Sequence, residues 1–344
     1  MRATVLTDAG LAKHAGRFVW LSIDTENEKN AAFLERYPWE AVPTFEVIDA
    51  ESEKIAYRWL GAVDAAELTR RFDEAERACR RTAPADIASP QGPDTTLAAL
   101  ATAGRFEECA RQAIEALPSL APAAVKANVA ATGLDCALSA PDDAPWRADA
   151  LSRLESATRE ALRYDGLLDD DRSALYGALV DARDRQHDET AGKAQATAWL
   201  DWLDRQAREA PSVEARAALD GHRVAAAQRA GAPERVLAVI EKSERELPKD
   251  YNPSARLAIV LREMGRYDDA LAASDRALRK VYGPRKLTLL EARATIFEKK
   301  GEVAGAKTAL NEALAYASTL PAAQRPKSMI AKIEKHLGQL GTAE

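Results

Sequence analysis

The chain contains few of the residues on which most chemical sites are built. Its 344 residues include three cysteines and four histidines, and aromatic side chains make up only 6% of them. The cysteines form no Cys-x-x-Cys pair, and no histidine lies at metal-ligand spacing from a cysteine or from another histidine. We therefore predict no metal site and no bound cofactor. The spacing also predicts buried or half-buried thiols, with no disulfide framework, at Cys79, Cys109 and Cys136.

Long apolar runs and an excess of basic residues are also absent. No run approaches the ~20 residues that a membrane helix needs, so we predict no membrane span. The net charge is −6, from 48 basic and 54 acidic side chains, which argues against a nucleic-acid partner. No phosphate-binding glycine loop, zinc-binding His-Glu-x-x-His or ordered Ser-His-Asp spacing is found. Residues 1–16 lack the pattern of a signal peptide, so the sequence as it stands predicts a cytoplasmic protein.

The N-terminal part has the periodicity of strands around one short helix. Residues 17–24 form an apolar run rich in β-branched and aromatic residues, which predicts a strand buried on both faces. Residues 27–37 predict a short amphipathic helix. Two strand-like runs follow, at 45–49 and 55–60, and the polar turn at 50–53 between them favours an antiparallel hairpin.

A capped helix is expected after the hairpin. Gly61 ends the strand pattern, and Asp64 is the predicted N-cap of a helix that runs to about Arg81. The side chains expected to point inward from this helix are Leu68, Phe72 and Ala75.

This order of elements resembles the second half of a thioredoxin-like domain, over roughly residues 1–82. The resemblance is carried by the strand from Val19 to Asp24, by Val42-Pro43-Thr44 before Phe45, and by Trp59-Leu60-Gly61 before the last helix. In that family the proline is cis, lies against the redox pair, and lets the preceding backbone receive a bound chain as an added strand. The resemblance implies this substrate-binding role for Val42, Pro43 and Thr44; the alternative is an ordinary trans X-Pro turn.

The Cys-x-x-Cys pair of that family is missing from this chain. Residues 1–15 are the only candidate for the helix that carries it, so the pair and the strand before it would fall ahead of residue 1. That strand is the shared neighbour of those predicted at 17–24 and 45–49, and unpaired strands are costly. One hypothesis is that Met1 is an internal methionine and that a longer natural chain supplies both features. The alternative is a degenerate, redox-inactive domain whose strands pair directly.

Beyond residue 95 the sequence has almost continuous helical periodicity. Gly231, Gly265 and Gly301 recur after 34 and 36 residues, each between two apolar helical patterns, and a similar copy surrounds Gly104. The clearest copy contains Leu257, Ala258, Leu261, Gly265, Tyr267, Ala270, Ala277, Leu278 and Pro284. These segments resemble tetratricopeptide repeats, in which stacked helix pairs bury a shared core.

Between the clear copies the pattern predicts more helices and one polar turn. The predicted helices lie near 122–139, 147–164, 170–187, 190–209 and 213–230, and a polar turn is expected at 186–194. A polar C-terminal helix at 327–340 suits a solubilising cap.

The resemblance to tetratricopeptide repeats also implies a binding surface. Such superhelices bind peptides or proteins along a concave face that is lined by the first helix of each pair. The candidate groove residues are Gln228, Arg229, Ile259, Arg262, Glu263, Glu291, Thr295 and Glu298. Because these positions mix both signs of charge, the sequence leaves the charge of the ligand open. The Lys/Asn pattern by which some family members hold a terminal carboxylate is not present.

Together these patterns predict an α+β part followed by an all-α part. The expected order is an incomplete thioredoxin-like domain at 1–82, a linker at 83–95 and an α-solenoid of about five or six helix pairs at 96–344. The main hypothesis is a protein–protein interaction scaffold with a redox-inactive thioredoxin-like module. The alternatives are a purely structural repeat protein and a fragment of a bacterial-type thiol-disulfide oxidoreductase, an enzyme only when extended upstream. Such an extension could carry an export signal, which would make the protein periplasmic or secreted.

Overall fold

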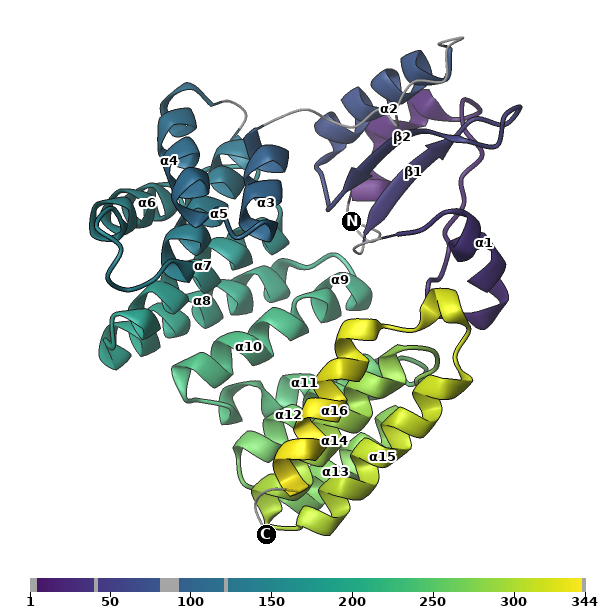
Figure 1. Ribbon diagram of the computed structural model, residues 1–344, viewed down its shortest axis with the longest axis vertical. Coiled ribbons are helices and arrows are strands. Elements are labelled where there is room, and N and C mark those ends of the chain that lie inside the picture. Colours follow the sequence, from purple (N-terminus) through teal and green to yellow (C-terminus); the bar gives the residue numbers. More distant parts are fainter. Residues whose placement is uncertain (1–4, 40–42, 81–92, 121–122, 342–344) are drawn as a thin grey trace. The chain divides into compact units, whose positions relative to one another are not determined.

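A computed structural model describes residues 5–39, 43–80, 93–120 and 123–341 (Figure 1). Their packing divides the chain into two compact units. The first unit comprises residues 1–15, 41–205 and 229–231, and the second comprises 16–40, 206–228 and 232–344. Residues 16–40 therefore belong to the second unit, although the segments on either side of them in the sequence belong to the first. Most of the predicted linker at 83–95 lies outside the described residues.

A two-stranded sheet and one helix stand near the beginning of the first unit. Strand β1 (Thr44–Ile48) pairs antiparallel with β2 (Ile55–Leu60), and helix α2 (Ala65–Cys79) packs on the hairpin (Figure 1). The Asp64 carboxylate accepts a hydrogen bond from the backbone N–H of Glu67 at 2.8 Å, which is the N-cap expected from the sequence. The predicted hairpin and capped helix are confirmed.

An aromatic cluster holds this helix to the hairpin. Trp59 is only 3% exposed and stacks on Phe45 across the two strands, with ring centroids 4.7 Å apart. The ring of Phe72 meets Trp59 edge-on from α2, and Leu68 and Ala75 on the same helical face are fully buried. The inward face predicted for α2 is therefore confirmed, and cross-strand stacking of this kind stabilises the sheet.

The strand predicted at residues 17–24 does not form. These residues adopt neither strand nor helix and belong to the second unit. Val19 is 90% exposed and Leu21 is 70% exposed, the opposite of a strand buried on both faces. A strand needs a neighbour for its backbone groups, and among the described residues β1 and β2 pair only with each other. The prediction is wrong because apolar, β-branched composition does not supply that neighbour.

Short helical turns stand at two other predicted positions. Two 3₁₀ turns, η1 (Val5–Thr7) and η2 (Ala9–His14), replace the helix considered for residues 1–15. The helix predicted at 27–37 forms as a 3₁₀ turn, η3 (Glu28–Asn30), followed by α1 (Ala31–Arg36). Its position is confirmed, although its helical part is shorter than the periodicity suggests.

The rest of the first unit is helical. Its helices are α3 (Pro93–Thr102), α4 (Phe106–Ala116), α5 (Ala123–Ser139), α6 (Arg147–Ala161), α7 (Asp169–Arg185) and α8 (Glu189–Glu209), the last as far as residue 205. A 3₁₀ turn, η4 (Leu117–Ser119), follows α4. From α3 to α7 each helix contacts the next, and α3 and α7 also contact α5, as in stacked helix pairs. The helices predicted from 122 to 209 are confirmed, but α8 begins inside the polar turn expected at 186–194.

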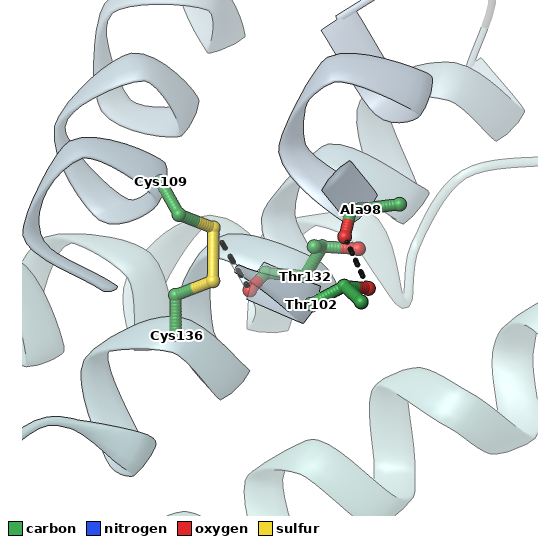
Figure 2. Close-up of a disulfide and its surroundings, with 5 residues drawn as sticks. All are labelled: Ala98, Thr102, Cys109, Thr132 and Cys136. Atoms are coloured by element: carbon green, nitrogen blue, oxygen red, sulfur yellow. Dashed lines mark hydrogen bonds between the residues drawn. A yellow bond between two sulfur atoms is a disulfide. The ribbon is translucent and has the colours of Figure 1, made fainter. Parts of the chain in front are cut away.

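A disulfide joins two of these helices. Figure 2 shows the bond between Cys109 of α4 and Cys136 of α5, whose Cα atoms are 6.2 Å apart. Both cysteines are fully buried in a core that includes Leu134 and Leu154. Their predicted state as thiols is wrong, because packing brings together two residues that are 27 positions apart. Only Cys79 remains a free, half-buried thiol.

The second unit continues the helix pairs. Its elements after residue 205 are α9 (Val213–Ala218), α10 (Asp220–Ala230, as far as residue 228), α11 (Glu234–Glu246), α12 (Asn252–Glu263), α13 (Tyr267–Leu278), α14 (Arg285–Lys300), α15 (Val303–Thr319), η5 (Ala322–Gln324) and α16 (Lys327–Gly341). From α11 to α16 each helix contacts the next, and α14 also contacts α12 and α16 (Figure 1). The helix predicted at 213–230 is interrupted at Leu219, and the C-terminal helix is confirmed.

Glycine and alanine produce the repeat geometry in the way their spacing suggests. Gly265 and Gly301 follow α12 and α14 with φ of +73° and +85°, a left-handed conformation that costs other residues steric strain. Ala258, Ala270 and Ala277 are buried between the helices, where small side chains permit close approach. The described chain is thus mostly helical and repeat-like, with one small sheet. None of the described helices is long and apolar enough to cross a membrane.

Candidate binding groove

A cavity of about 210 Å³ opens between α12 and α14 in the second unit. Its lining comprises Tyr251, Asn252, Ala255, Arg256, Ala258, Ile259, Arg262, Ser274, Ala277, Arg285, Thr288, Leu289, Ala292, Arg293 and Ile296. We call this cavity the groove. It lies on the first helices of two neighbouring pairs, and α13 contributes buried Ser274 and Ala277 to its lining.

One stripe of each helix forms the walls of the groove. On α12 the lining positions recur every three or four residues from Ala255 to Arg262, and on α14 they do so from Leu289 to Ile296. Residues at this spacing share one face of an α-helix. Alanines on both stripes leave the space between the helices open, and the larger apolar side chains of Ile259, Leu289 and Ile296 line it.

The charge of the lining has one sign. Four arginines reach the groove, Arg256, Arg262, Arg285 and Arg293, and the lining includes no aspartate, glutamate or lysine. Each guanidinium carries five N–H donors in a planar fork, a geometry that suits carboxylates. The groove therefore combines apolar walls with donors for an anionic group.

Three of these arginines pair with acidic residues outside the lining, and for Arg285 the partner is Glu26 at 2.7 Å. Arg262 donates to the carboxylate of its neighbour Glu263 at 2.6 Å. Arg293 pairs with Asp275 of α13 at 2.7 Å and also donates to the backbone carbonyl of Leu271. These contacts use Nε and Nη2 of Arg262 and Nη1 of Arg293, out of the five N–H donors that each guanidinium carries.

The charge of Arg256 is partly removed from solvent by burial. Its guanidinium donates to the backbone carbonyl of Ala217 at 3.1 Å. Burial lowers the pKa of Arg256, and the nearby carboxylate of Asp220 acts against that shift. Asp220 is itself fully buried and accepts a hydrogen bond from Ser243 at 2.6 Å, and burial raises its pKa. Asp220 thus acts electrostatically on Arg256 without being part of the groove lining.

Some of the groove residues expected from the sequence lie in this cavity. Ile259 and Arg262 are part of its lining, and Glu263 stands beside it as the exposed ion-pair partner of Arg262. Gln228 is exposed on α10. Arg229 belongs to the first unit, where it forms ion pairs with Asp181 and Asp184 of α7.

Two of the three candidates on α14 contact another helix, α16. Glu291 pairs with Lys332 of α16 at 3.0 Å, and Glu298 contacts His336 of the same helix. The Thr295 hydroxyl donates to the backbone carbonyl of Glu291 at 3.3 Å. Helix α16 therefore engages the face of α14 that carries Glu291 and Glu298.

The groove residues on α14 were not predicted from the sequence, but they have a simple register with the groove residues on α12. Ala255, Ile259 and Arg262 line the groove, and the positions 34 residues later, Leu289, Arg293 and Ile296, line it as well. The expected candidates Thr295 and Glu298 instead lie 36 residues after Ile259 and Arg262, which is the spacing of Gly265 and Gly301. Two residues correspond to about 200° around an α-helix, which is the opposite face. The helix α14 is four residues longer than α12, so the distance between terminal glycines does not give the register of the stripe.

The turn expected from the thioredoxin-like resemblance lies at the start of β1. Val42 is outside the described residues. Pro43 is partly buried, and its carbonyl accepts a hydrogen bond from the backbone N–H of Gly61 at 2.9 Å, which extends the pairing of the hairpin. Thr44 is the first residue of β1 and stands opposite Leu60.

The chain's cysteines do not gather at this turn. Cys109 and Cys136 form the buried disulfide, and Cys79 ends α2 as a single thiol. Burial raises the pKa of the Cys79 thiol, which makes it a weaker nucleophile at neutral pH. Neither arrangement provides an accessible pair of sulfurs for thiol–disulfide exchange.

Comparison with models of protein families and with curated proteins gives no match to this chain. The candidate site is therefore defined by its geometry: an apolar groove between two repeat helices, with four arginines in its lining.

Proposed function

We propose that this chain is a protein–protein interaction scaffold whose second unit binds an extended, acidic segment of another protein in the groove. The observation that carries the proposal is the composition of the lining, in which apolar walls meet four arginines and no acidic side chain. The resemblance of the helix pairs to tetratricopeptide repeats supports it, because members of that family bind peptides along their first helices.

The dimensions of the groove suggest what such a segment contains. A cavity of about 210 Å³ between Ile259, Leu289 and Ile296 has room for an aliphatic side chain and is too small for a folded element. Guanidinium groups bind carboxylates and backbone carbonyls through charge-assisted hydrogen bonds. We therefore expect a leucine or isoleucine flanked by aspartate or glutamate.

Peptide binding tests this proposal directly. Peptides with a central leucine flanked by Asp and Glu are compared with matched peptides that carry Asn and Gln, using the full chain. The acidic peptides should bind more tightly, and added salt should weaken them more than the neutral set. Equal binding of both sets would contradict the proposed ligand.

A matched pair of arginine variants locates the binding. Arg262→Gln removes a guanidinium from the lining, and the loss of a charged hydrogen bond should weaken an acidic peptide at least about 10-fold. Arg266→Gln changes an exposed arginine that pairs with Asp269 outside the lining, so peptide affinity should stay within about 2-fold. If the two variants behave alike, the peptide binds elsewhere.

We propose that the N-terminal hairpin and α2 form a redox-inactive module in this chain. The fully buried disulfide between Cys109 and Cys136 and the single thiol of Cys79 support this, because exchange needs an accessible thiolate and a resolving partner. The 344-residue chain should therefore fail to reduce insulin. Sustained turnover would contradict this part of the proposal.

A thiol-disulfide oxidoreductase is the second candidate. The hairpin, the proline before β1 and the packed helix α2 resemble the second half of a thioredoxin-like domain, and Val19 and Leu21 are exposed in a segment of strand-like composition. In this interpretation a strand and a Cys-x-x-Cys helix from outside the 344 residues complete the sheet. Insulin reduction by an upstream-extended chain tests it, and the absence of an in-frame Cys-x-x-Cys upstream would exclude it.

A further inference from the structure

An acidic turn near the N-terminus is bound by the last repeats of the second unit. The turn consists of residues 24–27, Asp-Thr-Glu-Asn, and its distant partners Tyr282, Arg285 and Gln324 belong to the same unit although they lie more than 250 residues later. The backbone N–H of Glu26 donates to the Asp24 carboxylate at 2.9 Å, and the Asn30 side chain donates to the Asp24 carbonyl at 2.8 Å. The turn is therefore held in shape by its own hydrogen bonds.

Two side chains receive its two carboxylates. The hydroxyl of Tyr282 donates to Asp24 at 2.6 Å, and the guanidinium of Arg285 pairs with Glu26 at 2.7 Å. The hydrogen bond to Asp24 raises the pKa of Tyr282 to about 12, which keeps the phenol protonated as a donor. These two contacts select a turn with an acidic residue at its first and third positions and any residue between them.

The backbone of the turn is recognised as well. The side-chain amide of Gln324 donates to the carbonyls of Thr25 and Asn27, both at 2.9 Å, and Gln324 is only 3% exposed. Gly283 has a φ of +61°, and a Cβ there would stand 2.9 Å from the carbonyl carbon of Glu26. The carbonyl group passes over Gly283 because that residue has no side chain.

We propose that Tyr282, Gly283, Arg285 and Gln324 form a recognition site for an Asp-x-Glu turn of a polypeptide. In this structure the chain's own residues 24–27 occupy the site in cis. The site also accepts the same turn in trans once the cis segment is displaced. The site contacts two carboxylates and two backbone carbonyls of the turn at the same time, and Gly283 leaves room for the carbonyl of Glu26. This combination distinguishes the site from a single surface ion pair. Arg285 also lines the groove, so the two sites share one guanidinium, whereas Tyr282, Gly283 and Gln324 lie outside the groove lining and belong to this site alone.

Competition between cis and trans ligands tests the site. The probe is a fluorescein-labelled peptide of residues 20–36, titrated with the full chain and with its Asp24→Asn/Glu26→Gln variant. The intact cis turn has an effective concentration in the millimolar range, so the variant should bind the probe at least about 10-fold more tightly than the natural chain. A probe that carries the same two substitutions should not bind either chain.

Further variants connect the binding to the proposed residues. In the Asp24→Asn/Glu26→Gln chain, Tyr282→Phe/Arg285→Gln should abolish probe binding while the helical circular dichroism is retained. Gly283→Val should also abolish probe binding, because the valine side chain would block the carbonyl of the bound turn. If the valine also disturbs the turn before α14, the Tyr282→Phe/Arg285→Gln variant still tests the site. Arg325→Gln, a change to an arginine that donates to the nearby backbone carbonyls of Leu320 and Ser318, should leave binding within about 2-fold.

Each result bears on the proposal. Tighter binding by the open variant that depends on Tyr282 and Arg285 supports it. Equal binding by the natural chain and the open variant would overturn it, and so would the absence of binding by the open variant at millimolar probe. Hydrogen exchange supplies the cis readout: amides of residues 24–30 should lose protection in Tyr282→Phe/Arg285→Gln, and unchanged protection would also overturn the proposal.

Discussion

The disulfide between Cys109 and Cys136 gives the most direct test of the first unit. It joins α4 to α5 across 27 residues of sequence, and both cysteines are fully buried. Closing a loop of this length lowers the entropy of the unfolded chain by about 12 cal/mol/K, which corresponds to about 3.5 kcal/mol at 25 °C. Reduction should therefore weaken this part of the first unit by a few kcal/mol.

Two chains separate the cross-link from the volume of its sulfurs. Reduced natural protein loses the cross-link but keeps both sulfur atoms, so its opening free energy should fall by about 3.5 kcal/mol. Cys109→Ala/Cys136→Ala also leaves two small voids in a packed core, and each should cost about 1 kcal/mol more. Cys79→Ala, at the free half-buried thiol, is the control and should change the opening free energy of α4 and α5 by less than about 0.5 kcal/mol.

Hydrogen exchange and thiol labelling measure these effects separately. Exchange of amides in α4 and α5 reports the opening free energy of that region. Alkylation of the denatured, non-reduced chain should label one thiol, Cys79, of the three cysteines. Labelling of all three would show that the disulfide is absent. Equal protection of α4 and α5 in the oxidised and reduced protein would refute the entropic argument.

Three other perturbations test the packing, the electrostatics and the turns. Trp59→Ala removes a buried ring that stacks on the hairpin and should destabilise α2 by about 3–5 kcal/mol in hydrogen exchange, whereas Leu60→Ala, 47% exposed, should change it by less than about 0.5 kcal/mol. Burial raises the pKa of Asp171 to about 6, above its unfolded value, so this carboxyl reduces stability increasingly as pH rises from about 4 to about 6. Asp171→Asn should therefore stabilise the first unit by about 1–2 kcal/mol above pH 6 and not below pH 4 in denaturant titrations; a gain independent of pH would contradict the assignment. Gly301→Ala should cost about 1–2 kcal/mol because φ is +85°, whereas Gly338→Ala inside α16 should gain about 0.5–1 kcal/mol, and equal melting shifts would rule out the conformational argument.

The sequence predicted correctly those elements that depend on interactions between residues close together in the chain. The N-cap at Asp64, the hairpin around residues 50–53 and the left-handed glycines at 265 and 301 depend on groups within a few residues of each other. Helical periodicity likewise located the helices between 122 and 209, because an amphipathic stripe needs only its own spacing to be visible. The recurrence of glycines indicated the repeat.

The register of the groove could be predicted only in part. The stripe on α12 was found through Ile259 and Arg262, but its counterpart on α14 was not, because the two helices differ in length. A comparison of the helices at an offset of 34 would have identified Leu289, Arg293 and Ile296 from the sequence. The single sign of charge in the lining emerges only when both stripes are in the correct register.

The sequence by itself determined where the helices, the hairpin and the repeat turns stand, since these depend on short-range hydrogen bonds and on periodic apolar faces. Only the tertiary structure decided which distant residues meet. Packing of α4 on α5 joined Cys109 to Cys136. Contacts across more than 250 residues placed Asp24 and Glu26 on the last repeats, and residues 17–24 form no strand there. Such pairings depend on which surfaces lie opposite each other, and composition at one position carries no information about its distant neighbour.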